Sequence, residues 1–266
     1  MIEMFEYDFM QRAFLAGIII SIISAIAGSF VVLKRYSLLA DTLAHVSLVG
    51  VSIAILFDNS PVYMAIIVSV IAAWMIEYLR SYHKIYSDSI LAIFLSGSLA
   101  LSVIIISVAN EFNSSLFAYL FGSILAVSSD DLILISIVGI LLLAIFVIFF
   151  RSFFFIAFDE EAAQTSGVPV KWLNFLLVTM VAIIIALSIR VVGTLLIGAL
   201  MVIPVIAALR FRKGFFHTVL LALGISLLSV ISGLTLSYHY SLPSGATIVA
   251  VVLGMFIASM LINRRG

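Results

Sequence analysis

The chain of 266 residues contains no cysteine. Disulfides are therefore excluded, and so are metal sites that are built on thiolate ligands. Any metal ion that this chain binds must be held by imidazole nitrogen or by carboxylate or carbonyl oxygen.

Charge is also scarce, since 10% of the residues are charged and 65% are hydrophobic. Soluble domains carry about 25% charged residues, so this composition indicates an integral membrane protein. Lys and Arg together number 13, as do Asp and Glu, which leaves no basic excess for binding nucleic acid. The first residues, "MIEMFEYDFMQR", lack the basic region and cleavage site of a signal peptide. We therefore expect the first apolar segment to remain as a membrane span.

Motifs for hydrolytic chemistry are missing. The sequence has no G-x-x-x-x-G-K-[ST] phosphate loop, no H-E-x-x-H and no G-x-S-x-G. The chain is therefore not expected to be an enzyme, and any ATP hydrolysis must come from a separate polypeptide.

Apolar runs of about 20 residues, the length that crosses a bilayer core of about 30 Å, recur along the whole chain. They predict an all-α, polytopic bundle of about nine spans, with residues 1–266 as a single transmembrane domain. The expected spans are 11–33, 38–57, 62–80, 88–108, 131–150, 170–189, 191–209, 217–237 and 245–262.

Basic residues lie beside alternate ends of these spans, which predicts the orientation. They are Lys34, Arg35, Arg80, Lys84, Arg151, Arg210, Arg212, Lys213, Arg264 and Arg265. The loops "DNSP", "NEFNSS" and "YHYSLPS" on the other side carry no Lys or Arg. The positive-inside rule then places the N-terminus outside and the C-terminus in the cytoplasm.

Two features do not fit the simple pattern of spans. The segment 114–128, "SSLFAYLFGSILAVS", is too short for a crossing and is expected to form a re-entrant or surface helix on the outer side. Arg190 falls at the outer junction of two spans, where we expect it to snorkel or to cap the last carbonyls of the span before it.

The second span contains two ionisable residues, Asp41 and His45. Four residues apart, they lie on one face of a helix, and ionisable groups inside a membrane usually face a partner or a water-filled cavity. They predict either a metal site or proton relay, or a buried polar pair that fixes helix packing. A carboxylate and an imidazole suit Zn²⁺ or Mn²⁺, but two ligands do not make a tight site.

The cytoplasmic segment 158–172, "FDEEAAQTSGVPVKW", predicts a short helix from Asp159 to Ser166 that ends at Gly167. It is either an ordinary capped loop helix or a docking helix for a soluble partner. The basic turn 209–217, "LRFRKGFFH", lies on the same predicted side of the membrane.

Five segments, spread over nearly the whole chain, carry a resemblance to a known family. They are "GSFVVLKRYSLLADTLAHVSLVGV" (28–51), "AYLFGSILAVSSDDL" (118–132), "FDEEAAQTSGV" (158–168), "VVGTLLIGALMVIPVIAALR" (191–210) and "GLTLSYHYSLPSGATIVAV" (233–251). In this order they resemble the permease subunit of zinc and manganese ABC importers, and bacterial zinc-uptake permeases most of all. The D-x-x-x-H element formed by Asp41 and His45 is the most specific of them.

This resemblance implies a homodimeric permease in the bacterial cytoplasmic membrane, with a shortened form of the vitamin B12 and iron-siderophore importer fold. Its partners would be two copies of a cytoplasmic ATP-binding subunit and an extracytoplasmic metal-binding protein. It would hold no cofactor tightly and would pass a divalent metal, zinc in the first place, to the cytoplasm.

The residues expected to act are of two kinds. Asp41 and His45 are the expected metal ligands, and His239 is a weaker candidate that is otherwise a solvated loop histidine. The expected contacts with the ATP-binding subunit are Asp159, Glu160, Glu161, Ala162, Gly167, Arg210, Arg212 and Lys213.

Three other interpretations stay open on the sequence. An importer of the same family could carry manganese or iron, since imidazole and carboxylate bind all three metals. A secondary transporter could use Asp41 and His45 as a proton relay. A structural membrane protein would need this pair only for stability.

Overall fold

A computed structural model describes residues 3–83, 87–109 and 114–262. The described chain is entirely helical apart from turns and loops. Its elements are the 3-10 helix η1 (Glu3–Glu6) and the α-helices α1 (Asp8–Leu33), α2 (Ser37–Leu56), α3 (Pro61–His83), α4 (Ser87–Val108), α5 (Ser114–Phe121), α6 (Ser129–Phe158), α7 (Glu160–Thr165), α8 (Val170–Ser188), α9 (Ile197–Leu209), α10 (Phe215–Tyr240) and α11 (Ser244–Ile262).

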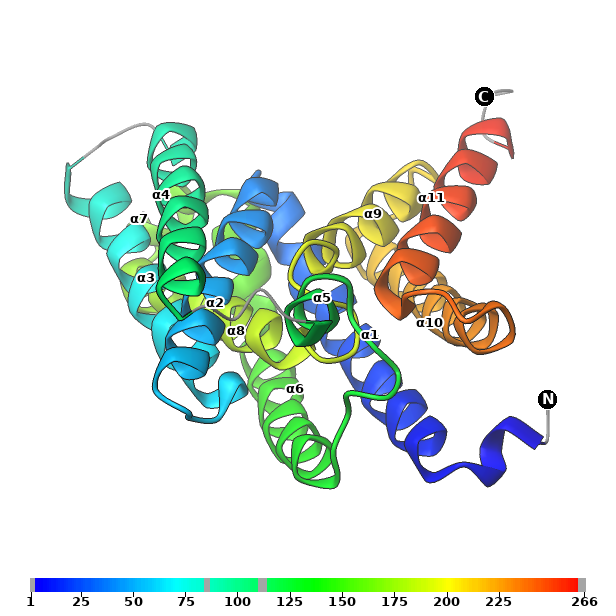
Figure 1. Ribbon diagram of the computed structural model, residues 1–266. Helices are drawn as coiled ribbons and strands as arrows, with labels where there is room; N and C mark the ends of the chain where they lie inside the picture. The colour runs from blue at the N-terminus through cyan, green and yellow to red at the C-terminus, as the bar shows by residue number, and fades with distance from the viewer. Residues whose placement is uncertain (1–2, 84–86, 110–113, 263–266) are drawn as a thin grey trace.

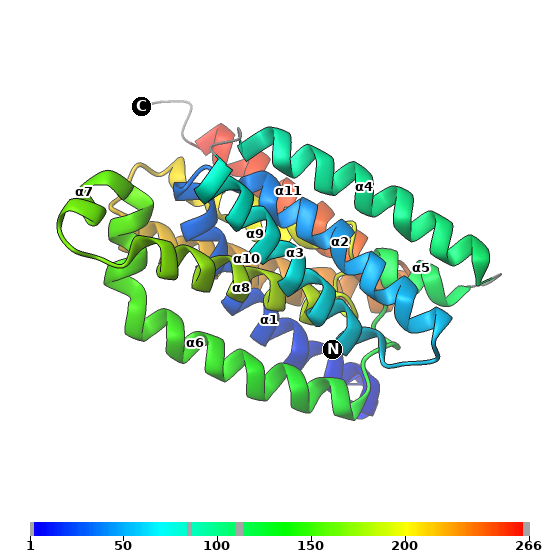
Figure 2. The same ribbon diagram turned by 90° about the vertical axis from the view of Figure 1, so that its left-hand side faces the viewer.

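The long helices form one bundle whose members run along a common direction (Figure 2). Within the described residues, eight of them are long and apolar enough to cross a membrane: α1, α2, α3, α4, α6, α8, α10 and α11. The predicted all-α, polytopic fold is therefore confirmed.

The centre of the bundle is formed by α1, α2 and α8. In an apolar 18-residue stretch of α2, 72% is buried inside the protein, whereas in the corresponding stretch of α6 the share is 22%. α2 packs against α3, α4, α8 and α9 (Figure 1). α2 is therefore among the most enclosed helices of the bundle, although Asp41 on it is exposed and His45 is half-buried.

The two ends of the bundle differ. Figure 2 shows α7, the turn between α9 and α10, and the end of α11 at one end, with α5 and the loop between α2 and α3 at the other. Arg12 near the start of α1 bonds Ser129 at the start of α6 (3.1 Å), and Lys34 after α1 pairs with Glu160 beyond the end of α6 (3.2 Å). α1 and α6 therefore run in parallel, from the α5 end to the α7 end.

The seventh expected span, 191–209, is helical only in its second part. α9 has 13 residues, and residues 189–196 before it form turns around Gly193, whose φ is +87°. The N–H groups of Thr194 and Leu195 bond the carbonyls of Tyr119 (2.9 Å) and Leu120 (3.1 Å) in the last turn of α5. The non-helical segment before α9 thus donates hydrogen bonds to carbonyls at the end of α5 that would otherwise have no partner within that helix.

Two other boundaries can be compared with expectation. The segment 114–128 does contain a helix too short to cross, α5, whose end is covered by the turns at 189–196. The fifth span was expected to stop at residue 150, but α6 continues to Phe158 and includes Arg151. Its apolar residues continue through "SFFFIAF", so no sequence signal ends the helix before Asp159.

Candidate functional site

Asp41 and His45 both lie on α2, as expected. Asp41 itself is exposed, but its neighbours on the helix are buried. Thr42, between the two residues, donates to the carbonyls of Leu38 (2.9 Å) and Leu91 (3.4 Å). That hydroxyl holds α2 against α4. The pair is therefore presented by a helix whose position in the bundle is fixed.

The Asp41 carboxylate lies against Gly198 in the first turn of α9. A Cβ atom built on Gly198 would overlap Asp41 Oδ1 and lie 2.8 Å from its Cγ. Leu196, the residue that precedes this helix, provides no side-chain cap for the first N–H groups. The positive end of α9 therefore faces the carboxylate, an arrangement that favours negative charge.

His45 is half-buried, and its buried Nδ1 atom has no hydrogen-bond partner among the residues that the structure describes. A buried ring nitrogen without a partner is costly and unusual in a structural role. No hydrogen bond among the described residues therefore commits this nitrogen to a structural role.

One copy of the chain brings together two candidate ligands, Asp41 and His45. Among the described residues, no three His, Cys, Asp or Glu side chains gather in a way that could hold a metal ion. His239 is not brought to Asp41 and His45: it is exposed in the last turn of α10, with Nδ1 2.9 Å from the Thr235 carbonyl oxygen. A complete site would need water, backbone oxygen or a second chain.

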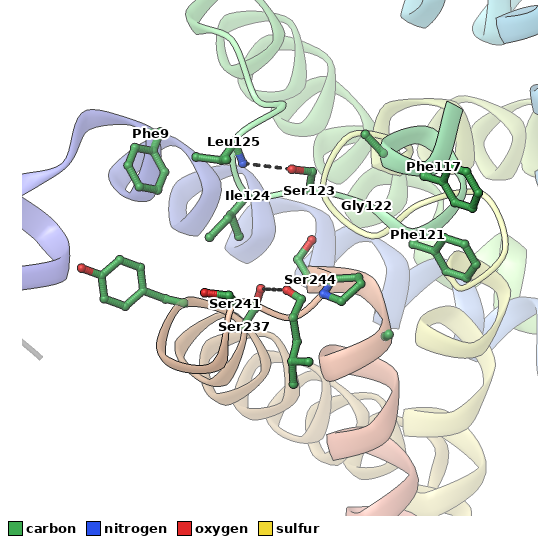
Figure 3. Close-up of a pocket in the computed structure, with 15 residues that line it drawn as sticks. Phe9, Phe117, Phe121, Gly122, Ser123, Ile124, Leu125, Ser237, Ser241 and Ser244 are labelled. Atoms are coloured by element: carbon green, nitrogen blue, oxygen red, sulfur yellow. Dashed lines mark hydrogen bonds between the residues drawn. The ribbon is translucent and has the colours of Figure 1, made fainter. Parts of the chain in front are cut away.

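A pocket of about 800 Å³ opens near the α5 end of the bundle. Figure 3 shows Phe9 of α1, Phe117 and Phe121 of α5, and Ser237, Ser241 and Ser244 around the α10–α11 junction. Its polar side chains are serines and Tyr238, and neither Asp41 nor His45 lines it. The pocket is therefore a separate feature from the pair of metal-binding candidates.

The chain between this pocket and Asp41 is the non-helical segment 189–196. Close contacts between backbones surround it: Ser244 Oγ donates to the Val191 carbonyl (2.8 Å), and a Cβ on Gly122 would lie 2.5 Å from the same oxygen. Gly198 follows within two residues and touches Asp41. Irregular backbone inside a membrane is tolerated where protein covers it or where it lines a pathway.

Arg190 lies at the start of that segment. It was expected to snorkel or to cap the last carbonyls of α8, but its guanidinium instead contacts residues in and after α5. Its guanidinium lies 5.0 Å from the centre of the Tyr119 ring, donates to the Ala126 carbonyl (3.4 Å) and is 3.7 Å from Asp131 Oδ2. The acidic start of α6 and the ring of Tyr119 draw the cation away from the helix that carries it. Arg190 therefore holds the segment from α5 to α6 in place.

The predicted docking helix is α7. Asp159 accepts a hydrogen bond from the Ala162 N–H (2.9 Å) and caps the helix, while Gly167 follows it with a φ of +81°. Glu161 is exposed and Ala162 is half-buried. At the same end of the bundle, Arg210 is half-buried, and Arg212 and Lys213 are exposed.

Glu160 differs from its neighbours, because its carboxylate turns toward the bundle. Its Oε2 atom is 3.2 Å from Lys34 Nζ, and its Oε1 atom accepts from Asn174 Nδ2 (2.9 Å) and is 3.7 Å from Arg80. Lys34 also donates to Asn174 Oδ1 (2.6 Å). Arg80 is bound in turn by both carboxylate oxygens of Glu77, at 2.6 and 3.0 Å.

The charges of this cluster reflect burial and pairing. Burial acts to raise the pKa of the Glu160 carboxyl, but Lys34 and Arg80, helped by hydrogen bonds from Lys34 and Asn174, hold that pKa below its usual value. Burial lowers the pKa of the Lys34 ammonium despite Glu160, and it raises the pKa of the nearby Tyr36 hydroxyl. Glu160 is therefore ionised and Tyr36 neutral at neutral pH.

Sequence reasoning did not find this cluster or the role of Gly198. Glu77 and Asn174 are polar residues inside apolar spans, which is a signal that could have marked them.

Comparison with known proteins decides the family. The model of the ABC 3 transport family matches residues 6–263. The chain belongs to this family. The permease of Haemophilus influenzae described as the high-affinity zinc uptake system membrane protein ZnuB is 34% identical, over 97% of this chain and 99% of its own. The manganese import system permease protein ScaB of Streptococcus parasanguinis is 32% identical, over 97% of this chain and 91% of its own.

Solved structures agree with the fold. PsaBC from Streptococcus pneumoniae, in complex with Fab, matches with a TM-score of 0.85 and 30% identity, over 96% of this chain and 91% of that one. A metal-chelate type ABC transporter in an inward-facing conformation matches with a TM-score of 0.77 and 14% identity, over 95% and 86%. The predicted resemblance to the metal-importer permeases is therefore confirmed, and this chain is a transmembrane permease subunit without an ATPase site of its own.

Proposed function

We propose that this permease imports zinc, which it receives from an extracytoplasmic binding protein and releases into the cytoplasm. The observation that carries the proposal is the pair Asp41 and His45, with its unpartnered Nδ1 atom, in a family whose relatives include zinc and manganese permeases. Family membership speaks against the secondary-transporter and purely structural interpretations, since an ABC permease transports with the help of a separate ATP-binding subunit.

The ligand set is completed by a second copy of the chain in this proposal. Two-fold symmetry would present two carboxylates and two imidazoles, and zinc takes four such ligands in a tetrahedron at about 2.0–2.2 Å. Manganese favours more oxygen ligands in an octahedral arrangement. The proposed N₂O₂ set therefore favours zinc, while the similarity to a manganese permease keeps manganese as the second candidate.

Metal selectivity tests this function. In a bacterial strain that lacks high-affinity zinc uptake, expression of the permease with its ATP-binding subunit and binding protein is expected to restore growth on limiting zinc. The same genes in strains starved of manganese or iron are expected to restore little growth. Rescue of the manganese-starved strain alone would overturn the choice of zinc and support the second candidate.

The orientation follows from the position of the basic residues. Lys34 pairs with Glu160 of α7, and the turn between α9 and α10, which carries Arg212 and Lys213, lies at the same end of the bundle. We place this α7 end in the cytoplasm by the positive-inside rule. The N-terminus and the pocket at the α5 end then face outward, where a binding protein would dock. α7 and the turn 209–217 face the ATP-binding subunits.

Cysteine labelling tests this orientation and the docking surface together, because the chain has no cysteine of its own. We expect Ser241→Cys to react with a membrane-impermeant maleimide from the outside, and Thr165→Cys at the end of α7 to react only after the membrane is opened. The ATP-binding subunit should then protect position 165 and leave position 241 reactive. Labelling of Thr165→Cys in intact cells would reverse the topology, and equal labelling with and without the subunit would exclude α7 from the contact.

A further inference from the structure

The charged cluster around Glu160 reaches from the surface into the end of the bundle. The Lys34 side chain is 3% exposed and Glu77 is completely buried, whereas the Glu160 side chain is 40% exposed. Burying the Lys34 ammonium removes water from it, and a carboxylate that stays solvated offsets little of that cost. Stability alone therefore gives little reason for this cluster.

Its geometry joins one short helix to three long ones. Glu160 on α7 contacts Lys34 at the end of α1, Asn174 on α8 and Arg80 on α3. Asn174 uses both ends of its amide, since it accepts from Lys34 (2.6 Å) and donates to Glu160 (2.9 Å). The carboxylate of Glu160 is thus held from several directions, and α7 cannot shift alone without breaking these bonds.

The cluster also reaches the helix that carries the metal-binding candidates. Tyr36 precedes the first residue of α2, and the centre of its ring lies 5.6 Å from Lys34 Nζ and 5.1 Å from Arg80 Cζ. Both cations face the ring, which is an attractive arrangement. Asp41 follows on the same helix within two turns. A short path of contacts therefore leads from α7, through Lys34 and Tyr36, to Asp41.

We infer that Lys34, Glu160, Asn174 and Arg80 are positioning residues that carry the movement of α7 to α1, α3 and α2 and so couple ATP hydrolysis to metal movement. The inference rests on the proposed docking of the ATP-binding subunit at α7. If α7 moved without the bundle, it would leave the buried Lys34 ammonium without its carboxylate, which is strongly unfavourable. The bundle helices and α7 therefore move together.

The coupling ratio, ATP hydrolysed per zinc ion transported, tests this role in vesicles that contain the full complex with its binding protein. The informative variant is Lys34→Met combined with Glu160→Met, because it removes the buried ammonium together with its carboxylate partner and fills their volume. We expect it to assemble and hydrolyse ATP, with a coupling ratio raised about five-fold or more, the lower end of the usual range for coupling between sites. The charge exchange Lys34→Glu with Glu160→Lys should restore part of the coupling.

A matched control removes an ion pair at the other end of the bundle. Asp131→Asn breaks the contact with Arg190 at 3.7 Å and is expected to leave the coupling ratio unchanged. An assembled Lys34→Met/Glu160→Met complex with the wild-type ratio would overturn the inference. If that variant does not assemble, the coupling ratio is measured for Asn174→Leu, which removes only the bridging amide. A raised ratio supports the inference, and the wild-type ratio overturns it. A wild-type complex that moves no zinc with ATP would instead refute the proposed function.

Discussion

Replacement of Asp41 and His45 together by alanine is expected to reduce ATP-driven zinc uptake by about 100-fold or more, because even groups that only orient metal ligands change metal affinity by about 10–100-fold. The two side chains are the ionisable groups of α2, and the buried Nδ1 atom of His45 makes no hydrogen bond within the described part of the chain. Each single variant would leave half of the proposed ligand set and is expected to lose most of the uptake. The measurement is radioactive zinc accumulation in vesicles that contain the ATP-binding subunit and binding protein.

The control for this experiment is Ser52→Ala. Ser52 is buried on the same helix and bonds the Leu48 carbonyl (2.7 Å), so its loss perturbs α2 without touching the pair. Uptake by this variant should stay near the wild-type rate. Assembly and basal ATP hydrolysis should persist in all variants. A double variant that assembles and still moves zinc at the wild-type rate would show that Asp41 and His45 are structural.

The bundle could be predicted from sequence because each membrane-crossing helix is a local feature. About 20 apolar residues between polar loops define a span regardless of what the rest of the chain does, and α2, α8 and α11 begin and end within a residue or so of expectation. The capped helix α7 was found in the same way, from Asp159 at its start and Gly167 after its end.

The break before α9 could not be predicted in this way, because it depends on a partner distant in sequence. The run "VVGTLLIGALMVIPVIAAL" is apolar apart from Thr194, and by local pattern it continues as a helix. It unwinds because the carbonyls of Tyr119 and Leu120 accept hydrogen bonds from Thr194 and Leu195, more than 70 residues away. The cluster at Glu160 has the same character, since Lys34 and Asn174 lie 140 positions apart.

Of the candidate site, sequence predicted the ligand types and their helix, but not their surroundings. The spacing of Asp41 and His45 requires only an α-helix, whereas the contact of Asp41 with Gly198 requires the tertiary structure. In the sequence, Gly198 is one of 15 glycines and has no feature that sets it apart. Its importance is seen only in the structure, where the Asp41 carboxylate packs against it.

The last prediction concerns this contact. Gly198→Ala is expected to lower zinc uptake by about ten-fold to 100-fold, since a displacement of about 1 Å in a site that acts by geometry costs up to about 100-fold. The new methyl group would overlap Asp41 Oδ1, so the carboxylate must leave its place beside α9. An alanine inside a helix is otherwise favourable over glycine by about 0.5–1 kcal/mol, so the helix itself is not expected to suffer.

Gly224→Ala is the matched control, because it makes the same change inside α10 where an added Cβ meets nothing within 4 Å. Uptake by this variant should equal that of the wild type, and its thermal stability should be equal or higher. For Gly198→Ala, the complex should assemble and hydrolyse ATP at the basal rate while zinc transport falls. Full zinc uptake by assembled Gly198→Ala would mean that the carboxylate can move without consequence, and Asp41 would then lose its place as a metal ligand held by α9.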